Sequence, residues 1–179
     1  IESPLFFKQG QNIIKRLSQK LSSKKRGSNN RKKARLDLAR AHRKIANQRR
    51  DFHFKLALEL ARRYAVICVE DLNIKGMQRL WGRKISDLGH ASFLNILAWQ
   101  MFKNGSQGVK IDRFYPSSKT CSVCLFQIKE LPLSIRSWVC PQCGAIHDRD
   151  INAAVNINRV GASALKGEVV RLVSTSDLC

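Results

Sequence analysis

The chain has 179 residues, and 44% of them are hydrophobic, which is enough apolar material for one compact domain with a small appended module. Its 33 Lys and Arg residues against 13 Asp and Glu residues give a formal net charge of +20, which argues against an ordinary enzyme of small metabolites and favours a polyanionic partner. Nucleic acid comes first, because each phosphate contact releases a condensed counterion, and an anionic membrane surface is the alternative. No run of the sequence approaches the roughly 18 apolar residues of a membrane-spanning helix.

The N-terminal residues lack the charged start, apolar stretch and small-residue cleavage site of a secretory signal, so we expect an intracellular protein. In a reducing compartment, six cysteines argue against a disulfide framework. Two of them, Cys68 in an apolar run and Cys179 at the end of the chain, are interpreted as structural or incidental. The chain begins at Ile1 and its first Met is Met77, which predicts a fragment or a truncated reading frame unless the chain has been processed.

Basic side chains are concentrated in the first third of the chain. Residues 15–63 hold 18 of the 33 cations and three acids, and so contribute +15 of the net charge of +20. Within them, residues 22–30 mix Ser, Gly and Asn with cations, which predicts an exposed turn between two helical pieces. Apolar residues then recur every three, four or seven positions and predict one face of a long amphipathic helix, made by Leu38, Ala41, Ile45, Phe52, Leu56, Leu60 and Tyr64.

The opposite face of this helix is strongly cationic. One interpretation is a solvated basic surface behind a stripe that faces the core. The alternative is a nucleic-acid contact surface, because the cations have few acidic neighbours and phosphate relieves their mutual repulsion. We favour this alternative for the face as a whole, which carries Arg31 and the predicted contact residues Lys32, Lys33, Arg35, Arg40, Arg43, Lys44, Arg49 and Arg50.

A short β-branched run at residues 65–69 follows and predicts a buried strand of the parallel type. Glu70 then stands at the carboxyl end of the strand, which in open α/β sheets faces the ligand crevice. Three further elements are a helix, a strand stopped by Pro116 and a final helix, predicted over residues 86–102, 109–115 and 151–160. The tail after Gly161 carries little signal.

Two Cys-x2-Cys pairs separated by 15 residues predict a structural zinc site held by Cys121, Cys124, Cys140 and Cys143. Two disulfides or a redox-active pair are the alternatives. Gly144 can adopt the positive φ that suits such a turn, whereas Leu125 after the first pair is less accommodating. Trp138 and Val139 enter the second turn as a strand, which predicts a zinc ribbon. His147 is interpreted as an ordinary polar loop residue rather than an additional ligand.

Four acids stand where local structure would expose them to a crevice: Glu70 and Asp71 at a strand end, Asp148 and Asp150 at a helix start. Acids at a helix start are usually caps, and we interpret Asp148 as one. Asp150 stands just past the predicted ribbon in a basic protein. Carboxylates from separate strand and helix ends are what a two-metal phosphodiester site needs, since two Mg2+ ions about 4 Å apart require bridging acids.

Four segments carry a resemblance to a known family: VEDLNIKGM at 69–77, SSKTCSVC at 117–124, CPQCG at 140–144 and HDRDINAA at 147–154. They resemble the transposon-encoded TnpB (OrfB) proteins, which are RuvC-type, RNA-guided DNA endonucleases related to type V CRISPR effectors. The resemblance extends from Pro4 through the final helix. It implies that Glu70 matches the second catalytic carboxylate and Asp150 the third. It also implies catalytic Mg2+, a guide RNA and DNA as partners, and a prokaryotic, nucleoid-associated protein of the cytoplasm.

The predicted fold class is α/β: a partial RNase H-like (RuvC) domain with an inserted four-cysteine zinc ribbon and a long basic helix. We expect the partial RuvC-like domain at residues 1–115, with its basic region at about 15–64. The zinc ribbon is expected at 116–147, and the last RuvC segment with the tail at 148–179.

The family's first catalytic Asp lies on the first strand of its sheet, and nothing resembling that segment precedes Glu70. We therefore predict that these 179 residues alone do not cleave DNA, and that the strand at 65–69 keeps an apolar edge open to a partner. A non-catalytic nucleic-acid-binding protein derived from the family is the alternative function. A ribosomal or transcription-type zinc ribbon would explain the charge and the cysteines but leaves the acidic motifs without a purpose.

Overall fold

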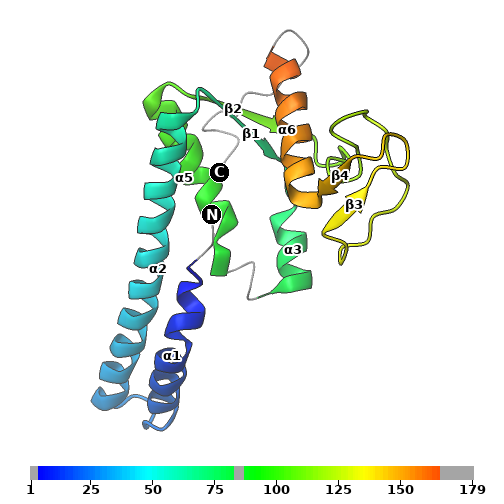
Figure 1. Cartoon of the computed structure of the whole chain (residues 1–179). Coiled ribbons are helices and arrows are strands. Elements are labelled where there is room, and N and C mark those ends of the chain that lie inside the picture. Colours follow the sequence, from blue (N-terminus) through cyan, green and yellow to red (C-terminus); the bar gives the residue numbers. More distant parts are fainter. Residues whose placement is uncertain (1–3, 83–86, 166–179) are drawn as a thin grey trace. The chain divides into compact units, whose positions relative to one another are not determined.

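The computed structural model describes residues 4–82 and 87–165, which form a mixed α/β structure with two small sheets (Figure 1). The chain divides into two compact units. Residues up to 59 together with 74–100 form the first unit, and residues 60–73 together with those from 101 onward form the second. None of the helices in the described ranges has the length and apolar character needed to cross a membrane.

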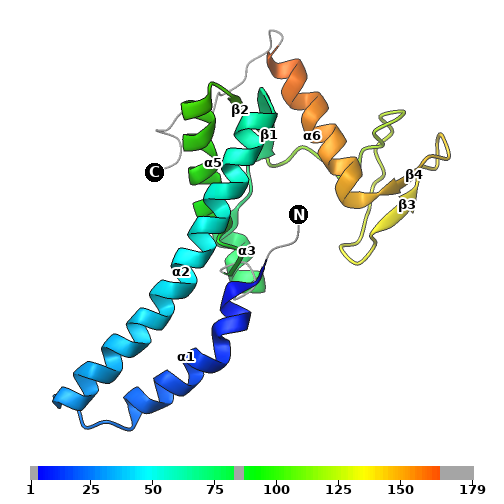
Figure 2. The same ribbon diagram turned by 60° about the vertical axis from the view of Figure 1, so that its left-hand side comes forward.

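The first unit contains helix α1 (Phe6–Ser22) and helix α2 (Asn29–Arg63) up to Glu59, and the two helices lie side by side as an antiparallel hairpin (Figures 1 and 2). The predicted turn between two helical pieces is confirmed. Arg31 holds this turn, because its guanidinium donates to the carbonyl oxygens of Leu21 and Lys24, each at 3.0 Å. The last carbonyls of a helix have no partner within the helix, so Arg31 caps the end of α1 and is a structural cation.

The two helices approach each other closely. A Cβ atom added to Gly10 would lie 2.5 Å from Cδ1 of Ile45, so only glycine fits at this point of α1 without a shift of the Ile45 side chain. Nearby, the rings of Phe6 and Phe52 meet edge to face with their centroids 6.1 Å apart. Helix α1 is therefore in close contact with α2, although no residue of α1 is fully buried.

The predicted apolar stripe of α2 is buried or half-buried, with one exception. Tyr64 is 45% exposed, because α2 ends at Arg63 and Tyr64 no longer follows the helical period. Three small residues that were not counted in the stripe are among its most deeply buried members: Ala34, Ala57 and Ala61.

Helix α1 begins without a cap from its own sequence, since Leu5 makes no side-chain cap hydrogen bond. Asp87, 80 positions along the chain from Phe7, supplies the cap: the Phe7 N–H donates to its Oδ1 at 3.0 Å. Arg49 of α2 faces the same oxygen at 3.9 Å, and Asp87 is only 9% exposed. A carboxylate at a helix N-terminus interacts favourably with the helix dipole, so Asp87 stabilises the start of α1.

Helices α3 (Ile74–Trp81) and α5 (His90–Asn104) follow in the chain. The helix predicted over 86–102 is found as α5, and its predicted start at Ser86 lies outside the described residues. Within the first unit, α5 packs on α2 through edge contacts of His53 with Phe93 and of Phe54 with Trp99, whose ring centroids are 5.5 and 6.2 Å apart.

In the second unit, strands β1 (Val66–Glu70) and β2 (Gln107–Ile111) pair in parallel, and Glu70 lies opposite Ile111. The parallel strand is confirmed, but β1 is only half-buried, because β2 is its one pairing partner in the described part of the chain. The second strand ends four residues earlier than predicted. Asp112 turns the chain, since its Oδ1 accepts a hydrogen bond from the Phe114 N–H at 2.6 Å.

Helix α6 (Arg149–Leu165) packs against this sheet. The contact is tight at Gly161, where an added Cβ atom would lie 2.3 Å from Sγ of Cys68 in β1. Strands β3 (Ser137–Val139) and β4 (Ile146–Asp148) form an antiparallel pair beside the first turn of α6, in the same unit (Figure 2). Their central residues, Trp138 and His147, face each other with ring centroids 4.7 Å apart.

Candidate metal centre and active-site residues

The four predicted cysteines converge: their sulfur atoms all lie within 4.8 Å of one another. The Sγ atoms of Cys121 and Cys143 are 3.7 Å apart, and those of Cys124 and Cys140 are 3.6 Å apart, and none of these four cysteines forms a disulfide. A tetrahedral zinc ion with Zn–S bonds of about 2.3 Å requires sulfurs about 3.8 Å apart. The cluster therefore has the size and the donor set for a metal such as zinc, and its disulfide alternative does not fit.

Each cysteine pair sits in a turn with the same backbone hydrogen bonds. In the first knuckle, residues 121–126, the Cys121 N–H donates to the Phe126 carbonyl (2.8 Å) and the Leu125 N–H to the Cys121 carbonyl (3.0 Å). The second knuckle, residues 140–145, repeats both bonds: the Cys140 N–H to the Ala145 carbonyl (2.8 Å) and the Gly144 N–H to the Cys140 carbonyl (2.9 Å). The two turns are thus equivalent in backbone structure.

The equivalent positions Leu125 and Gly144 both have positive φ, 67° and 72°. Glycine adopts this conformation freely, whereas a residue with a Cβ atom loses about 1–2 kcal/mol. Leu125 is therefore held in an unfavourable conformation by the first knuckle. The sequence indicated the poor fit of Leu125 but not that the residue adopts the same turn as Gly144.

Hydrogen bonds to the sulfurs prepare two thiols for metal binding. Burial raises the pKa of Cys121, but backbone N–H groups of Cys124 and Val123 and the His147 ring lower it to about 7. Burial likewise raises the pKa of Cys140, and N–H groups of the second knuckle outweigh it and lower the value to about 7. Both thiols thus lose their protons more easily than a free cysteine.

His147 lies in β4 and is 7% exposed, so its interpretation as an ordinary loop residue was wrong. Its Nε2 atom is 3.0 Å from Sγ of Cys121, and its ring packs on Trp138. His147 is outside the four-sulfur cluster and acts on it through Cys121. The sequence held no local signal for this contact, because the pairing of His147 with Trp138 across the strands is seen only in the structure.

Glu70 and Asp71, neighbours in sequence, have different surroundings. Glu70 is the last residue of β1, and burial raises the pKa of its carboxyl group. Asp71 pairs with Lys110 (2.7 Å) and with Arg113, and hydrogen bonds from Lys110 and then Arg113 lower its pKa. Asp71 is therefore neutralised by two cations at the end of the sheet, and Glu70 is the carboxylate that would gain most from a bound metal ion.

Asp148 and Asp150 also differ. The Asp148 Oδ1 atom accepts hydrogen bonds from the N–H groups of Asp150 and Ile151, both at 2.9 Å, so Asp148 is the predicted helix cap. The Asp150 side chain is 76% exposed, and its one ion pair among the described residues is a 3.4 Å contact with Arg136, whose side chain is 72% exposed. Asp150 is therefore available to a cation from solution.

Among the described residues, the cysteine cluster is the single group of three or more potential metal ligands. Glu70 and Asp150 thus form no such cluster with a third acid. Both belong to the second unit, where α6, which carries Asp150 in its first turn, packs on the sheet whose strand β1 ends at Glu70.

Two buried asparagines of α6 were not predicted as site residues. Asn152 and Asn156 are 2% and 0% exposed, and their amides bond the backbone that enters the first knuckle. Their spacing of four residues on a helix was the available signal, because it puts two polar side chains on the face that is otherwise apolar.

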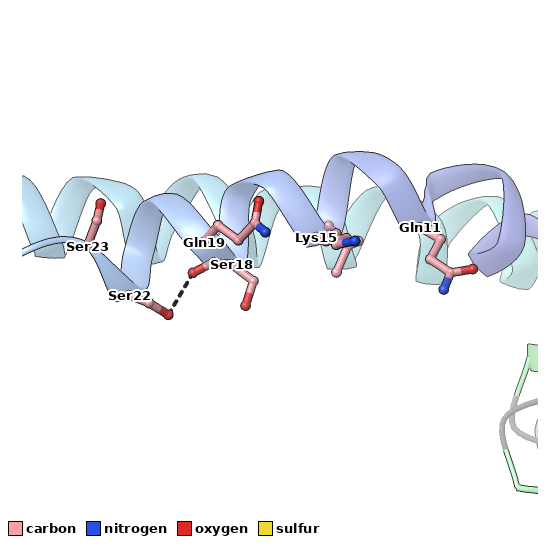
Figure 3. Close-up of a pocket in the computed structure, with 7 residues that line it drawn as sticks. Gln11, Lys15, Ser18, Gln19, Ser22 and Ser23 are labelled. Atoms are coloured by element: carbon pink, nitrogen blue, oxygen red, sulfur yellow. Dashed lines mark hydrogen bonds between the residues drawn. The ribbon is translucent and has the colours of Figure 1, made fainter.

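The predicted nucleic-acid contacts on α2 have exposed side chains in seven of eight cases. Arg49 differs, since its side chain is 24% exposed and faces Asp87. A shallow open depression of about 850 Å³ runs along α1 (Figure 3). Its lining comes from one helix and the residue after it, and contains a single cation: Gln11, Ile14, Lys15, Ser18, Gln19, Ser22 and Ser23.

Two models of known protein families match the chain. One described as a Cas12f1-like TNB domain matches residues 90–157, and one described as a probable transposase, OrfB of IS605, matches residues 1–80. A "Putative RNA-guided DNA endonuclease" of Streptomyces pristinaespiralis is 41% identical over 146 residues, which cover 80% of this chain and 36% of the relative.

Two further relatives have the same character. The "TnpB-like protein L79" of Acanthamoeba polyphaga mimivirus is 34% identical over 142 residues, 75% of this chain and 27% of the relative. The "Putative RNA-guided DNA endonuclease InsQ" of Escherichia coli K12 is 30% identical over 183 residues, 92% of this chain and 45% of the relative. The chain thus spans between about a quarter and a half of the length of these relatives. Two adjoining family models and relatives that match most of its residues show that the chain belongs to the TnpB (OrfB) family.

Proposed function

We propose that the chain is part of a TnpB-like, RNA-guided DNA endonuclease and carries two of the three carboxylates of a RuvC-type active site. The observation that carries this proposal is the contrast within each acidic pair. Asp71 is paired with two cations, whereas its neighbour Glu70 ends a parallel strand. Asp148 caps helix α6, whereas Asp150 is exposed on that helix, which packs against the sheet.

In the complete protein, Glu70 and Asp150 would hold Mg2+ together with a carboxylate that these 179 residues do not supply. Bound Mg2+ lowers the pKa of an attacking water and stabilises the leaving oxygen of the phosphodiester. The protein's own part is to keep both carboxylates ionised and oriented. The burial that raises the Glu70 pKa favours the uncharged acid, and a cation at this position would reverse that preference.

The exposed cations of α2 would bind the phosphates of the guide RNA and the target DNA. They fit this role because helix α2 contains 12 cations and three acids, and phosphate contacts of this kind are additive and independent of sequence. The open edge of β1 is expected to pair with another strand of an RNase H-like sheet in the complete protein. We assign zinc a structural role, since four sulfur ligands leave no position for water.

The test uses a complete TnpB-like protein that contains this segment, with its guide RNA. Glu70→Gln and Asp150→Ala are each expected to abolish Mg2+-dependent cleavage, by about 1000-fold or more, while binding of the target is retained. Asp148→Asn is the matched control, because asparagine is an equally good cap, and it should cleave at close to the normal rate. Normal cleavage by Asp150→Ala would show that the assignment is wrong.

The isolated chain of 179 residues is expected to bind nucleic acid without cutting it. Mg2+-dependent cleavage by the purified chain, lost in Glu70→Gln, would contradict this. The alternative function, non-catalytic binding, is favoured by the same exposed cations. It would be supported if the complete protein bound its target and Asp150→Ala changed nothing.

A further inference from the structure

The first knuckle and the start of α6 are joined by side chains, not by backbone pairing. Asn152 and Asn156 lie one helical turn apart on α6 and point their amides at residues 117–122. Polar side chains that are 2% and 0% exposed must have partners in the protein, since water does not reach them. These partners are all backbone groups of the segment that carries Cys121.

The contacts enclose the first zinc ligand. Asn152 Nδ2 donates to the carbonyl of Thr120 at 2.8 Å, and its Oδ1 accepts from the N–H of Ser122 at 2.9 Å. A single amide therefore holds the residue before Cys121 and the residue after it. Asn156 Nδ2 donates to the same Thr120 carbonyl at 2.6 Å and to that of Ser117 at 2.9 Å, which fixes the approach to the knuckle.

Amide side chains fit these two positions, as hydrogen-bond donors, better than apolar or carboxylate side chains would. An apolar side chain would fill this space without the cost of burying a polar group, and a carboxylate could not donate to the Thr120 carbonyl. Asn156 even leaves its own Oδ1 without a hydrogen-bond partner among the described residues, which costs about 1–3 kcal/mol. Stability alone does not account for this arrangement, whereas a need to fix the backbone around Cys121 does.

Asp150 stands two residues before Asn152, in the first turn of α6, and within residues 4–82 and 87–165 its exposed side chain is oriented by the Arg136 contact alone. We propose that Asn152 and Asn156 are positioning residues that fix the Cys121 side of the zinc site to the turn that carries Asp150. Zinc binding at the four cysteines and ordering of the Asp150 turn are then one coupled event. This rests on the proposed function only in the role given to Asp150.

The test measures zinc affinity of the full 179-residue chain by competition with a chromophoric chelator. Partners that orient metal ligands change metal affinity by about 10- to 100-fold when removed, and we expect this loss for Asn152→Ala. Hydrogen exchange at residues 150–153 should rise in the same variant at equal zinc occupancy. Asn158→Ala is the matched control, because Asn158 lies on the same helix with an exposed side chain, and both readouts should stay within twofold of the parent chain.

A second variant covers the case in which Asn152→Ala does not fold. Asn156→Ala removes the donor for Thr120 and Ser117 but leaves both contacts of Asn152, so it should show a smaller loss of zinc affinity. Zinc affinity within twofold of the parent in a folded Asn152→Ala, or slow exchange at 150–153 after zinc removal, would overturn the proposal. Neither readout depends on cleavage, so a failure here is distinct from a failure of the proposed endonuclease function.

Discussion

The α1–α2 hairpin and the four-cysteine part of the second unit differ in how many residues would share each proposed role. On the hairpin, many exposed cations of one kind follow each other along α2, so we expect no single one to be essential. In the second unit, individual groups have separate tasks: four sulfurs form the metal cluster, the amide of Asn152 holds the first knuckle, and Gly161 leaves no room for a methyl group where α6 meets β1. A phosphate-binding surface tolerates such redundancy because its energy is a sum of similar screened terms, whereas a tetrahedral site needs all of its ligands.

Loss of a zinc ligand should have the largest effect. Cys140→Ser is expected to abolish stoichiometric zinc binding, since structural zinc contributes about 10–16 kcal/mol that is also folding free energy. Native mass spectrometry measures the bound metal, and hydrogen exchange should increase across both knuckles and around Asp150. Cys68→Ala, at a cysteine outside the cluster, is the control and should retain one zinc ion. Unchanged exchange near Asp150 after chelation would show that zinc does not order this region.

Gly161→Ala should come next, with a loss of about 1–3 kcal/mol in the free energy of unfolding. The new Cβ atom would lie 2.3 Å from Sγ of Cys68, so helix α6 and strand β1 must separate. Urea unfolding at saturating zinc measures the loss. The double variant with Cys68→Ala should recover part of it, because the clashing sulfur is then absent but Cβ of residue 68 still lies 2.9 Å from the added Cβ atom. A Gly161→Ala chain as stable as the parent would mean that α6 is not in close contact with the sheet.

Exchanging the residues with positive φ between the two knuckles should change the free energy of unfolding by a smaller amount. Gly144→Leu should lose about 1–2 kcal/mol purely through its positive φ, because no atom lies within 4 Å of the added Cβ. Leu125→Gly should instead raise the free energy of unfolding, but by less, since the relief of backbone strain is offset by about 0.5–1 kcal/mol of conformational entropy that glycine loses on folding. If both substitutions destabilise the chain equally, the knuckles are not equivalent in the way their hydrogen bonds indicate.

Single cations of the hairpin should matter least. Lys33→Ala is expected to weaken binding of a labelled duplex by a similar factor for every sequence, and to reduce the slope of log affinity against log salt by about 0.9. Fluorescence anisotropy at several salt concentrations measures both. Arg31→Ala is the informative comparison, because this cation caps α1 and its loss should lower helix stability instead. A flat salt dependence of the parent chain would rule out phosphate contact as the main term.

The sequence predicted those features of the structure that depend on residues close together in the chain. The cysteine spacing predicted the metal cluster, the apolar period predicted α2, and the acid before α6 predicted its cap at Asp148. Small errors have local causes too: Asp112 turns the chain and ends β2 early, and Tyr64 follows the last helical residue.

Contacts between distant segments were beyond such reasoning. Periodicity identifies the buried face of a helix but not the groups that cover it, so the partners of Asn152 and Asn156, 30 to 39 residues away, could not be named. The same holds for the contact of His147 with Cys121. The conformation of Leu125 was missed because its knuckle, not its own preference, sets its φ.

The cap that Asp87 provides for α1 also bears on the order of folding. The first turn of α1 gains this partner only after 80 more residues have been made, because the hydrogen bond joins Phe7 to Asp87. At ribosomal rates of about 5–20 residues per second, that interval is about 4–16 s, long enough for a helical hairpin to form and equilibrate. We therefore expect the start of α1 to fray on the nascent chain until Asp87 reaches it.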